Sequence, residues 1–231
     1  MASLDVDRFV ERLGKIHSHF SKHRSTAAWN NASCLSLCRG PLDDSNNTYL
    51  KSVLLHQYLF GYELPDLILL LTKEGDLHVM ASQKKIDFIA AASDKMDGRL
   101  HLHPRQKADD NAANWEAMQQ VIASGGSVTT TGGDGDGDGD GNNNTTSSSI
   151  VIGCLVKEQS KNSDDIKSLV GQWETTHLTT ATDNDDSNSN SNIQLVDCAP
   201  GLSYVMALKD AAELDLMKKS SVLSNKLMKH G

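Results

Sequence analysis

The spacing of apolar residues predicts a chain of alternating helices and strands. Apolar side chains recur every three or four positions from Val6 to Phe20, which is the period of an amphipathic helix. Residues 34–38 alternate instead and predict a strand. Residues 50–60 are apolar enough for a largely buried helix, and Gly61 is well placed to end it.

The next part of the chain predicts a β-hairpin followed by a helix. The apolar runs 67–71 and 77–80 flank the turn 73–76, and Ser82 would cap a helix from Gln83 to about Ala92. The later pattern predicts a strand at 99–103, a helix at 111–123, a strand at 150–156, a helix from Ile166 to Trp173, a strand at 193–196, an apolar segment at 202–208 and a final helix from about Ala211. This alternation, with one hairpin, predicts an α/β fold in which helices flank a layered mixed β-sheet.

Two polar tracts interrupt the pattern, at about residues 125–149 and 180–192. Gly-Asp repeats and runs of Asn, Ser and Thr predict disordered inserts, and the repeats lack the terminal Glu and the spacing of an EF-hand calcium loop. The tracts hold seven acidic residues and no basic one, so a net charge of −8 becomes −1 for the rest of the chain. A nearly neutral lobe without clustered Lys and Arg predicts no direct sequence-specific binding to nucleic acid.

Composition points to an intracellular lobe without a membrane partner. A membrane-spanning helix needs about 18 consecutive apolar residues, and no apolar run in the sequence approaches that length. The N-terminus also lacks the pattern of a signal peptide. The four cysteines lie in or beside apolar runs, which predicts buried thiols in a reducing compartment: Cys34, Cys38, Cys154 and Cys198.

The residues that could carry chemistry do not form a catalytic constellation. His19 and His23 have a spacing that a metal ion can use, but no third ligand is in view, and a solvated helix face is the favoured interpretation. His101 and His103 fall on one face of a strand, interpreted as a polar face. Nucleophile-elbow, phosphate-loop and dinucleotide motifs are missing. The sequence therefore predicts a non-enzymatic lobe with no metal and no cofactor.

One local feature suggests a binding surface. Lys84 and Lys85 follow Ser82 in the first turn of a predicted helix, where the helix dipole disfavours cations. One interpretation is a solvated surface. The other is a small basic patch that meets an acidic or hydrogen-bonding partner.

Two segments carry a family resemblance. Residues 58–66, Y-L-F-G-Y-E-L-P-D, together with the later S-Q-K-K at 82–85, resemble the N-terminal domain of the large subunit of FACT, a histone chaperone. Residues 208–219 look like the junction that follows this domain, although Leu208 stands where the family usually has Val. Trp173 and Val196-Asp197 also sit where the family has a tryptophan-bearing helix and a V-D-I strand. The junction is shared more loosely with aminopeptidase P and creatinase relatives.

The resemblance implies a creatinase/aminopeptidase P N-terminal-domain-like fold. Residues 1–208 would form the α/β N-lobe, and residues 209–231 would begin the helix leading to a pita-bread lobe that is absent from this chain. In active relatives the catalytic residues belong to that larger lobe. The N-lobe is therefore expected to be a non-catalytic binding module.

The resemblance also implies partners, a location and a site. We expect a nuclear, chromatin-bound subunit that contacts core histones, meets the small HMG-box-type FACT subunit through regions outside this chain, and reorganises nucleosomes during transcription, replication and repair. The expected histone- or peptide-binding residues are Tyr62, Glu63, Ser82, Lys84 and Lys85. The alternative is the N-lobe of an aminopeptidase P-type metallopeptidase whose catalytic lobe is missing.

Overall fold

A six-stranded sheet in the order β4-β3-β2-β1-β5-β6 forms the centre of the molecule. The computed structural model describes residues 3–42, 49–106, 108–125, 150–162, 167–178 and 193–230. The strands are β1 (Cys34–Arg39), β2 (Leu67–Thr72), β3 (Leu77–Ala81), β4 (Leu100–Pro104), β5 (Ile150–Cys154) and β6 (Ile193–Asp197). The helices are α1 (Val6–His23), α2 (Lys51–Phe60), α3 (Gln83–Ala90), η1 (Ser93–Lys95), α4 (Ala112–Gly125), α5 (Val156–Asn162), α6 (Leu169–Gln172), η2 (Trp173–His177), α7 (Ala199–Ala207) and α8 (Ala211–His230).

The sheet is mixed, as the sequence predicted. β2 pairs antiparallel with both β1 and β3, and the predicted hairpin is confirmed by the pairing of Leu71 with Leu77. The remaining pairs, β3 with β4, β1 with β5 and β5 with β6, are parallel. Parallel neighbours place their carboxyl ends at the same edge of the sheet, so the residues that follow β3 and β4 lie close together.

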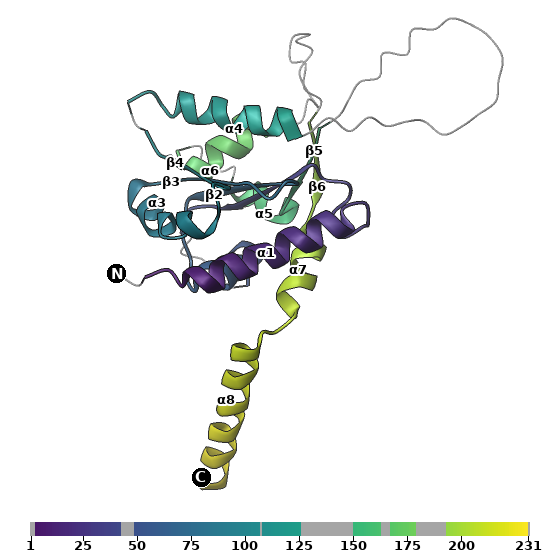
Figure 1. Ribbon diagram of the computed structural model, residues 1–231, viewed down its shortest axis with the longest axis vertical. Coiled ribbons are helices and arrows are strands. Elements are labelled where there is room, and N and C mark those ends of the chain that lie inside the picture. Colours follow the sequence, from purple (N-terminus) through teal and green to yellow (C-terminus); the bar gives the residue numbers. More distant parts are fainter. Residues whose placement is uncertain are drawn as a thin grey trace, which may run out of the picture.

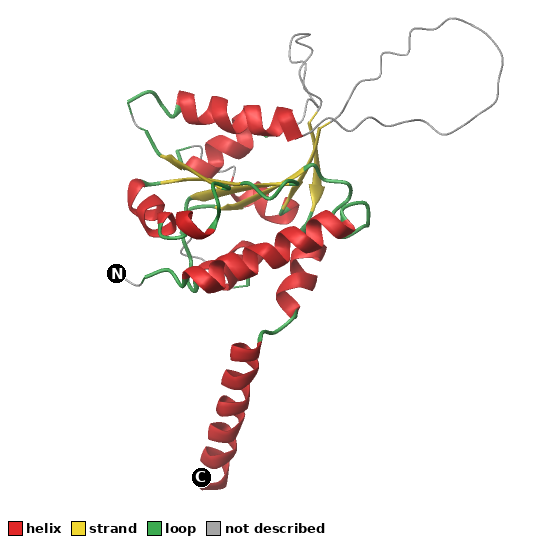
Figure 2. Cartoon of the chain, viewed as in Figure 1, coloured by secondary structure: helices red, strands yellow, loops and turns green. Residues whose placement is uncertain are grey.

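Helices cover both faces of this sheet. Figure 1 shows α4 and α6 on one side and α1, α3 and α7 on the other, and Figure 2 shows the strands as one layer between them. Alternate β2 residues therefore enter different cores: Leu69 and Leu71 pack with α1 and α2, while Ile68 and Leu70 pack with α4 and α6. Burial on both faces explains why β2 is continuously apolar from Leu67 to Leu71 rather than alternating.

Two predicted elements differ from the structure. The predicted strand 150–156 ends at Cys154, and Val156 instead begins α5, where it is exposed, so its apolar side chain does not mark a buried strand position. Of the predicted helix from Ile166 to Trp173, the described part is a short α6 followed by the π-helical turn η2. The predicted inserts at 125–149 and 180–192 lie outside the described residues, except for Gly125, which ends α4.

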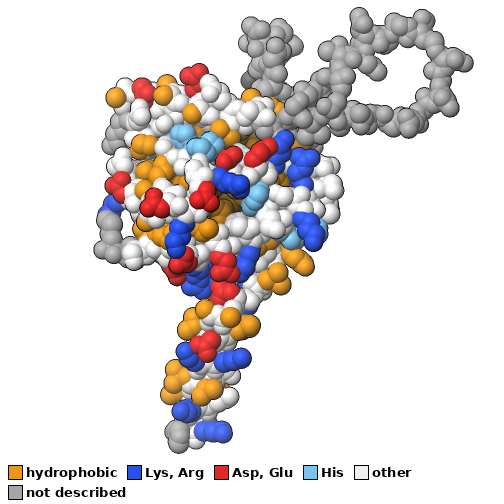
Figure 3. Space-filling model, viewed as in Figure 1, with side chains coloured by type: hydrophobic (Ala, Val, Ile, Leu, Met, Phe, Trp, Pro, Cys, Tyr) orange, Lys and Arg blue, Asp and Glu red, His pale blue; other side chains and the backbone are white. Residues whose placement is uncertain are grey.

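The last helix, α8, projects away from the rest of the molecule (Figure 1). Apolar side chains lie among lysines along it in Figure 3, and seven large ones are exposed: Leu214, Leu216, Met217, Val222, Leu223, Leu227 and Met228. Among the described residues, the structure contains no helix with the length and hydropathy needed to cross a membrane.

Candidate functional site

The candidate site begins at the loop between α2 and β2. Gly61 ends α2 in the left-handed conformation, with φ of 80°, and its N–H donates to the Gln57 carbonyl at 3.1 Å. Glycine reaches this conformation without steric cost, so the predicted helix stop is confirmed. The turn directs residues 62–66 toward α3.

The buried side chain of His56 holds the conformation of this loop. The Leu64 N–H donates to Nδ1 of the fully buried His56 at 3.2 Å. Burial, reinforced by the nearby cations Arg39 and Lys85, lowers the pKa of His56 to about 3, so the ring is neutral and accepts this hydrogen bond. The loop conformation is therefore set by the core rather than by solvent.

Tyr62 and Glu63 are both engaged within the lobe. The Tyr62 ring lies 5.1 Å from the Phe88 ring of α3, and its partial burial raises the pKa of the phenol. The Glu63 carboxylate accepts a hydrogen bond from Nε of the buried Arg39 at 2.6 Å. Tyr62 is thus a half-buried platform, and Glu63 is an ion-pair partner whose charge Arg39 compensates.

Ser82 occupies the position before α3, as predicted, but does not cap the helix with its side chain. Its backbone is extended, and its carbonyl accepts from the N–H groups of Lys85 and Ile86 at 2.9 and 3.1 Å. The Ser82 hydroxyl is exposed and makes no hydrogen bond within the described part of the chain. The prediction of a side-chain cap was wrong, and the hydroxyl is available to a partner instead.

The two lysines of α3 have different environments. Lys84 is exposed, whereas the half-buried Lys85 donates through Nζ to the Pro65 carbonyl and, at 3.5 Å, to the Asp66 carbonyl. Burial lowers the pKa of Lys85, the charge of Asp66 opposes this shift, and Arg105 adds to it. Lys85 therefore fastens α3 to the loop, while Lys84 remains a solvated cation.

Arg105 joins this surface although the sequence did not single it out. β3 and β4 are parallel with Ala81 opposite Pro104, so Ser82 and Arg105 emerge at the same edge, and the Arg105 N–H donates to the Ala81 carbonyl at 2.8 Å. The Arg105 guanidinium lies 3.5 Å from the Asp66 carboxylate. Arg105 directly follows a predicted strand. That position would have pointed to the site only if the parallel pairing of this strand with β3 had been known.

The histidines and cysteines that the sequence singled out lie in packing contacts. His19 is not simply a solvated residue, because its Nδ1 accepts from Trp29 Nε1 at 3.0 Å and its ring stacks on Tyr204. His101 and His103 share one strand face, as predicted, and both stack on His78. All four cysteines are free and buried, which confirms the prediction of buried thiols. Within the described ranges, no group of three or more His, Cys, Asp or Glu side chains could hold a metal ion.

Comparison with known proteins gives a consistent match. Residues 4–170 match the family model "FACT complex subunit SPT16 N-terminal lobe domain". The chain is 29% identical to FACT complex subunit SPT16 of Arabidopsis thaliana over 99% of its own length, and 25% identical to FACT complex subunit spt-16 of Caenorhabditis elegans over 95%. It spans only 18% of the length of each of these relatives.

Solved structures show the same fold. The chain superposes with a TM-score of 0.67 on the N-terminal domain of SPT16 from Cicer arietinum, at 24% identity, and equally on that from Eremothecium gossypii, at 22% identity. Each match covers 99% of this chain and 44% of the solved chain. The expected aminopeptidase-like N-terminal fold is thereby confirmed.

Proposed function

Because this chain belongs to the family of FACT complex subunit SPT16 N-terminal lobe domains, we propose that it is a non-catalytic lobe that binds core histones. The family is one of histone chaperones, and the alternative, the N-lobe of an aminopeptidase P-type metallopeptidase, is not favoured by the matches to SPT16. The division into an N-lobe at 1–208 and the start of a connecting helix at 209–231 is part of the same proposal.

The partners and the location follow from this assignment. Core histones would meet this lobe, and the small HMG-box-type FACT subunit would bind regions of the complete protein outside this chain. The protein would act in the nucleus, on chromatin, in the reorganisation of nucleosomes. Because the chain spans 18% of the length of its relatives, this lobe would supply one contact among several.

The exposed hydroxyl of Ser82 and the ammonium group of Lys84 are the observation that carries the binding proposal. Ser82 directly follows β3 and Lys84 lies in the first turn of α3, and neither group has a hydrogen-bond or ion-pair partner in the described residues. A hydroxyl and an ammonium group suit the carbonyl and carboxylate acceptors of a histone surface. Lys85 and Glu63 would act by holding this edge in place, through Pro65 and Arg39.

A titration of purified core histones against the chain tests this proposal. The double variant Ser82→Ala/Lys84→Ala should weaken binding by about threefold to tenfold, as expected for the loss of exposed polar contacts. Lys73→Ala is the matched control, because Lys73 is an exposed lysine in the turn after β2, at the opposite end of β3 from Ser82. Equal histone affinities of the double variant and the wild type would remove the α3 edge from the proposal.

A further inference from the structure

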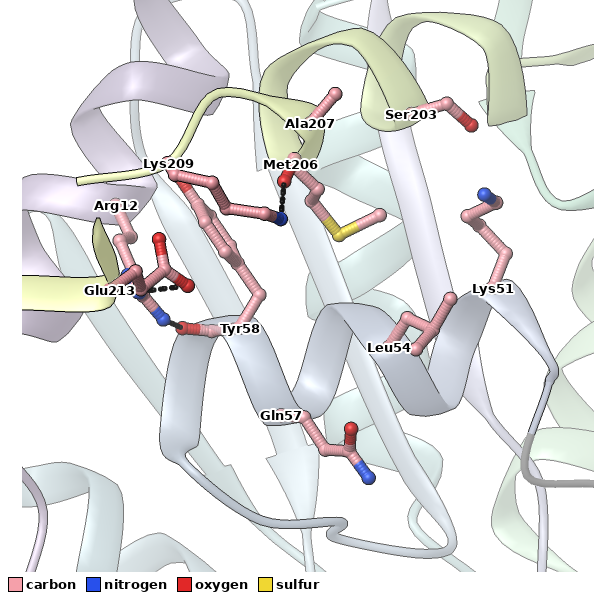
Figure 4. A pocket seen from close by; sticks show the side chains of 10 residues that line it. All are labelled: Arg12, Lys51, Leu54, Gln57, Tyr58, Ser203, Met206, Ala207, Lys209 and Glu213. Carbon is pink, nitrogen blue, oxygen red and sulfur yellow. Dashed lines mark hydrogen bonds and ion pairs between the residues drawn. The ribbon is translucent and has the colours of Figure 1, made fainter. Parts of the chain in front are cut away.

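A hollow lined by none of the α3-edge residues lies beside α2. It is a cavity of about 380 Å³ between α2 and α7, and the segment leading into α8 closes one end. In Figure 4, Lys51 and Ser203 point toward one another at one end, and Arg12, Tyr58, Lys209 and Glu213 gather at the other. Leu54 and Met206 lie between these two polar ends.

The end near α8 contains buried donors without acceptors. Arg12 is 3% exposed; its Nη1 donates to the Tyr58 carbonyl at 2.6 Å, and its Nη2 contacts Asp210 and Glu213 at 2.8 and 2.9 Å. Arg12 Nε and the Tyr58 hydroxyl are also buried, yet neither has a hydrogen-bond partner in the described structure. Buried polar groups are nearly always paired, so this wall of the cavity lacks an acceptor.

Three of the residues that line the cavity are cations, Arg12, Lys51 and Lys209, and one, Glu213, is an anion. Arg12 pairs with both Glu213 and Asp210, whereas no carboxylate in the described ranges pairs with the ammonium group of Lys51 or Lys209. Within the described residues, the one acceptor of Lys209 is the Met206 carbonyl, at 3.1 Å. The nearby Glu158 carboxylate is bound by the backbone N–H groups of Lys51 and Ser52, at 2.5 and 3.2 Å. Two ammonium groups that have no ion-pair partner among the described residues therefore stand at the two ends.

The middle of the cavity is apolar and open. Leu54 is 40% exposed although it lies in a largely buried helix, and Met206 faces it from α7. A flexible methionine adapts well to an incoming apolar side chain. The order along the cavity is thus cation, apolar surface, cation.

We infer that this cavity binds an acidic peptide segment in which an apolar side chain lies between carboxylates. The apolar side chain would pack on Leu54 and Met206, and the flanking carboxylates would meet Lys51 and Lys209. The Tyr58 hydroxyl and Arg12 Nε would gain an acceptor on the wall beside Lys209. Core histones are basic proteins, so this ligand differs in charge from the one proposed for the α3 edge, and either proposal can fail without the other.

Fluorescence anisotropy with a labelled Glu-Glu-Leu-Glu-Glu peptide tests the inference on the whole chain. The double variant Lys51→Gln/Lys209→Gln removes both charges and should weaken binding about tenfold, because the loss of each exposed ion pair weakens it about threefold. A Gln-Gln-Leu-Gln-Gln peptide should lose at least as much, and a peptide with Ser in place of Leu should also bind more weakly. Raising the salt from about 50 mM to about 300 mM should weaken the wild-type complex.

Matched variants separate this site from general charge attraction. Lys73→Gln removes an exposed lysine outside the cavity and should leave peptide affinity unchanged, as should Ser82→Ala/Lys84→Ala. Thermal unfolding of Lys51→Gln/Lys209→Gln checks that the fold is retained. Failure of the wild type to bind the acidic peptide would overturn the inference. Equal binding by the cavity variant and Lys73→Gln, or equal binding of the glutamine peptide, would overturn it too.

Discussion

The guanidinium group of Arg12 lies 2.8 Å from the carboxylate of Asp210, a residue 198 positions away in the sequence. Arg12 belongs to α1, and Asp210 stands directly before α8. Asp210 and Glu213 also cap this helix reciprocally, because each carboxylate accepts from the backbone N–H of the other, at 2.8 and 3.0 Å. The buried arginine thus fastens the start of α8 to the lobe.

Arg12→Ala should lower the free energy of unfolding by about 3 kcal/mol, because it leaves the two carboxylates and the Tyr58 carbonyl without their shared donor. Arg8→Ala is the matched control: Arg8 is 38% exposed and lies 3.7 Å from the same Asp210 carboxylate. This control should cost less than about 1 kcal/mol. Urea denaturation measures both, and similar losses would contradict the role given to Arg12.

Asp210 should titrate well below an ordinary aspartate. The N–H of Glu213 and the guanidinium of Arg12 lower the pKa of Asp210 from 3.8 to about 2. The carboxylate holds its proton less tightly in the folded chain than in the unfolded chain. Its contribution to stability is therefore fully present above pH 3.8 and is lost as the pH falls toward 2. NMR titration of the side-chain carboxyl carbon measures this pKa, and a midpoint near 3.8 would show that the contacts are not maintained in solution.

His78 should make the free energy of unfolding depend on pH at higher pH than Asp210 does, between about 4 and 6.5. Burial, with the neighbouring rings of His101 and His103, lowers the pKa of His78 from 6.5 to about 4. Between these values the unfolded chain binds a proton that the folded lobe does not, so stability is complete above 6.5 and falls toward pH 4. The His78→Gln variant should reduce this fall by about 1 to 2 kcal/mol. Unfolding at several pH values gives the slope, and an unchanged slope would contradict the assignment.

Two glycines should respond to alanine with opposite signs. Gly61→Ala should destabilise the lobe by about 1 kcal/mol, because alanine is strained at a φ of 80°. Gly14→Ala should stabilise it by about 0.5 to 1 kcal/mol, because Gly14 lies inside α1 with nothing within 4 Å of the added Cβ. Thermal or urea unfolding of the pair provides the measurement, and a shared sign would refute the explanation from backbone conformation.

The neighbouring lysines of α3 should separate stability from binding. Lys85→Met should lower the free energy of unfolding by about 1 to 2 kcal/mol, because the Pro65 and Asp66 carbonyls lose their donor. Lys84→Met should change stability by less than about 0.5 kcal/mol, since Lys84 is solvated. Urea unfolding of both variants beside the wild type tests this division, and the reverse order would contradict it.

The sequence determined the local elements and the family. The period of 3.6 predicted α1, the two apolar runs around a turn predicted the β2–β3 hairpin, and Gly61 predicted the end of α2, all correctly. The resemblance of segments 58–66 and 82–85 indicated the family that the comparisons then identified. Arg12 also carried a local sign of its role, because it falls on the buried face of α1 between Phe9 and Leu13.

Only the tertiary structure decided which groups act and which support. Lys84 and Lys85 are adjacent in sequence, but the Pro65 carbonyl lies within reach of Lys85 alone. Arg105 reaches the α3 edge because β3 and β4 are parallel, and the cavity exists because α7 packs beside α2. Strand order and helix packing depend on burial of apolar surface summed over the whole lobe. A window of sequence contains the period of one element but not the partner that element will meet, so these contacts could not be predicted from it.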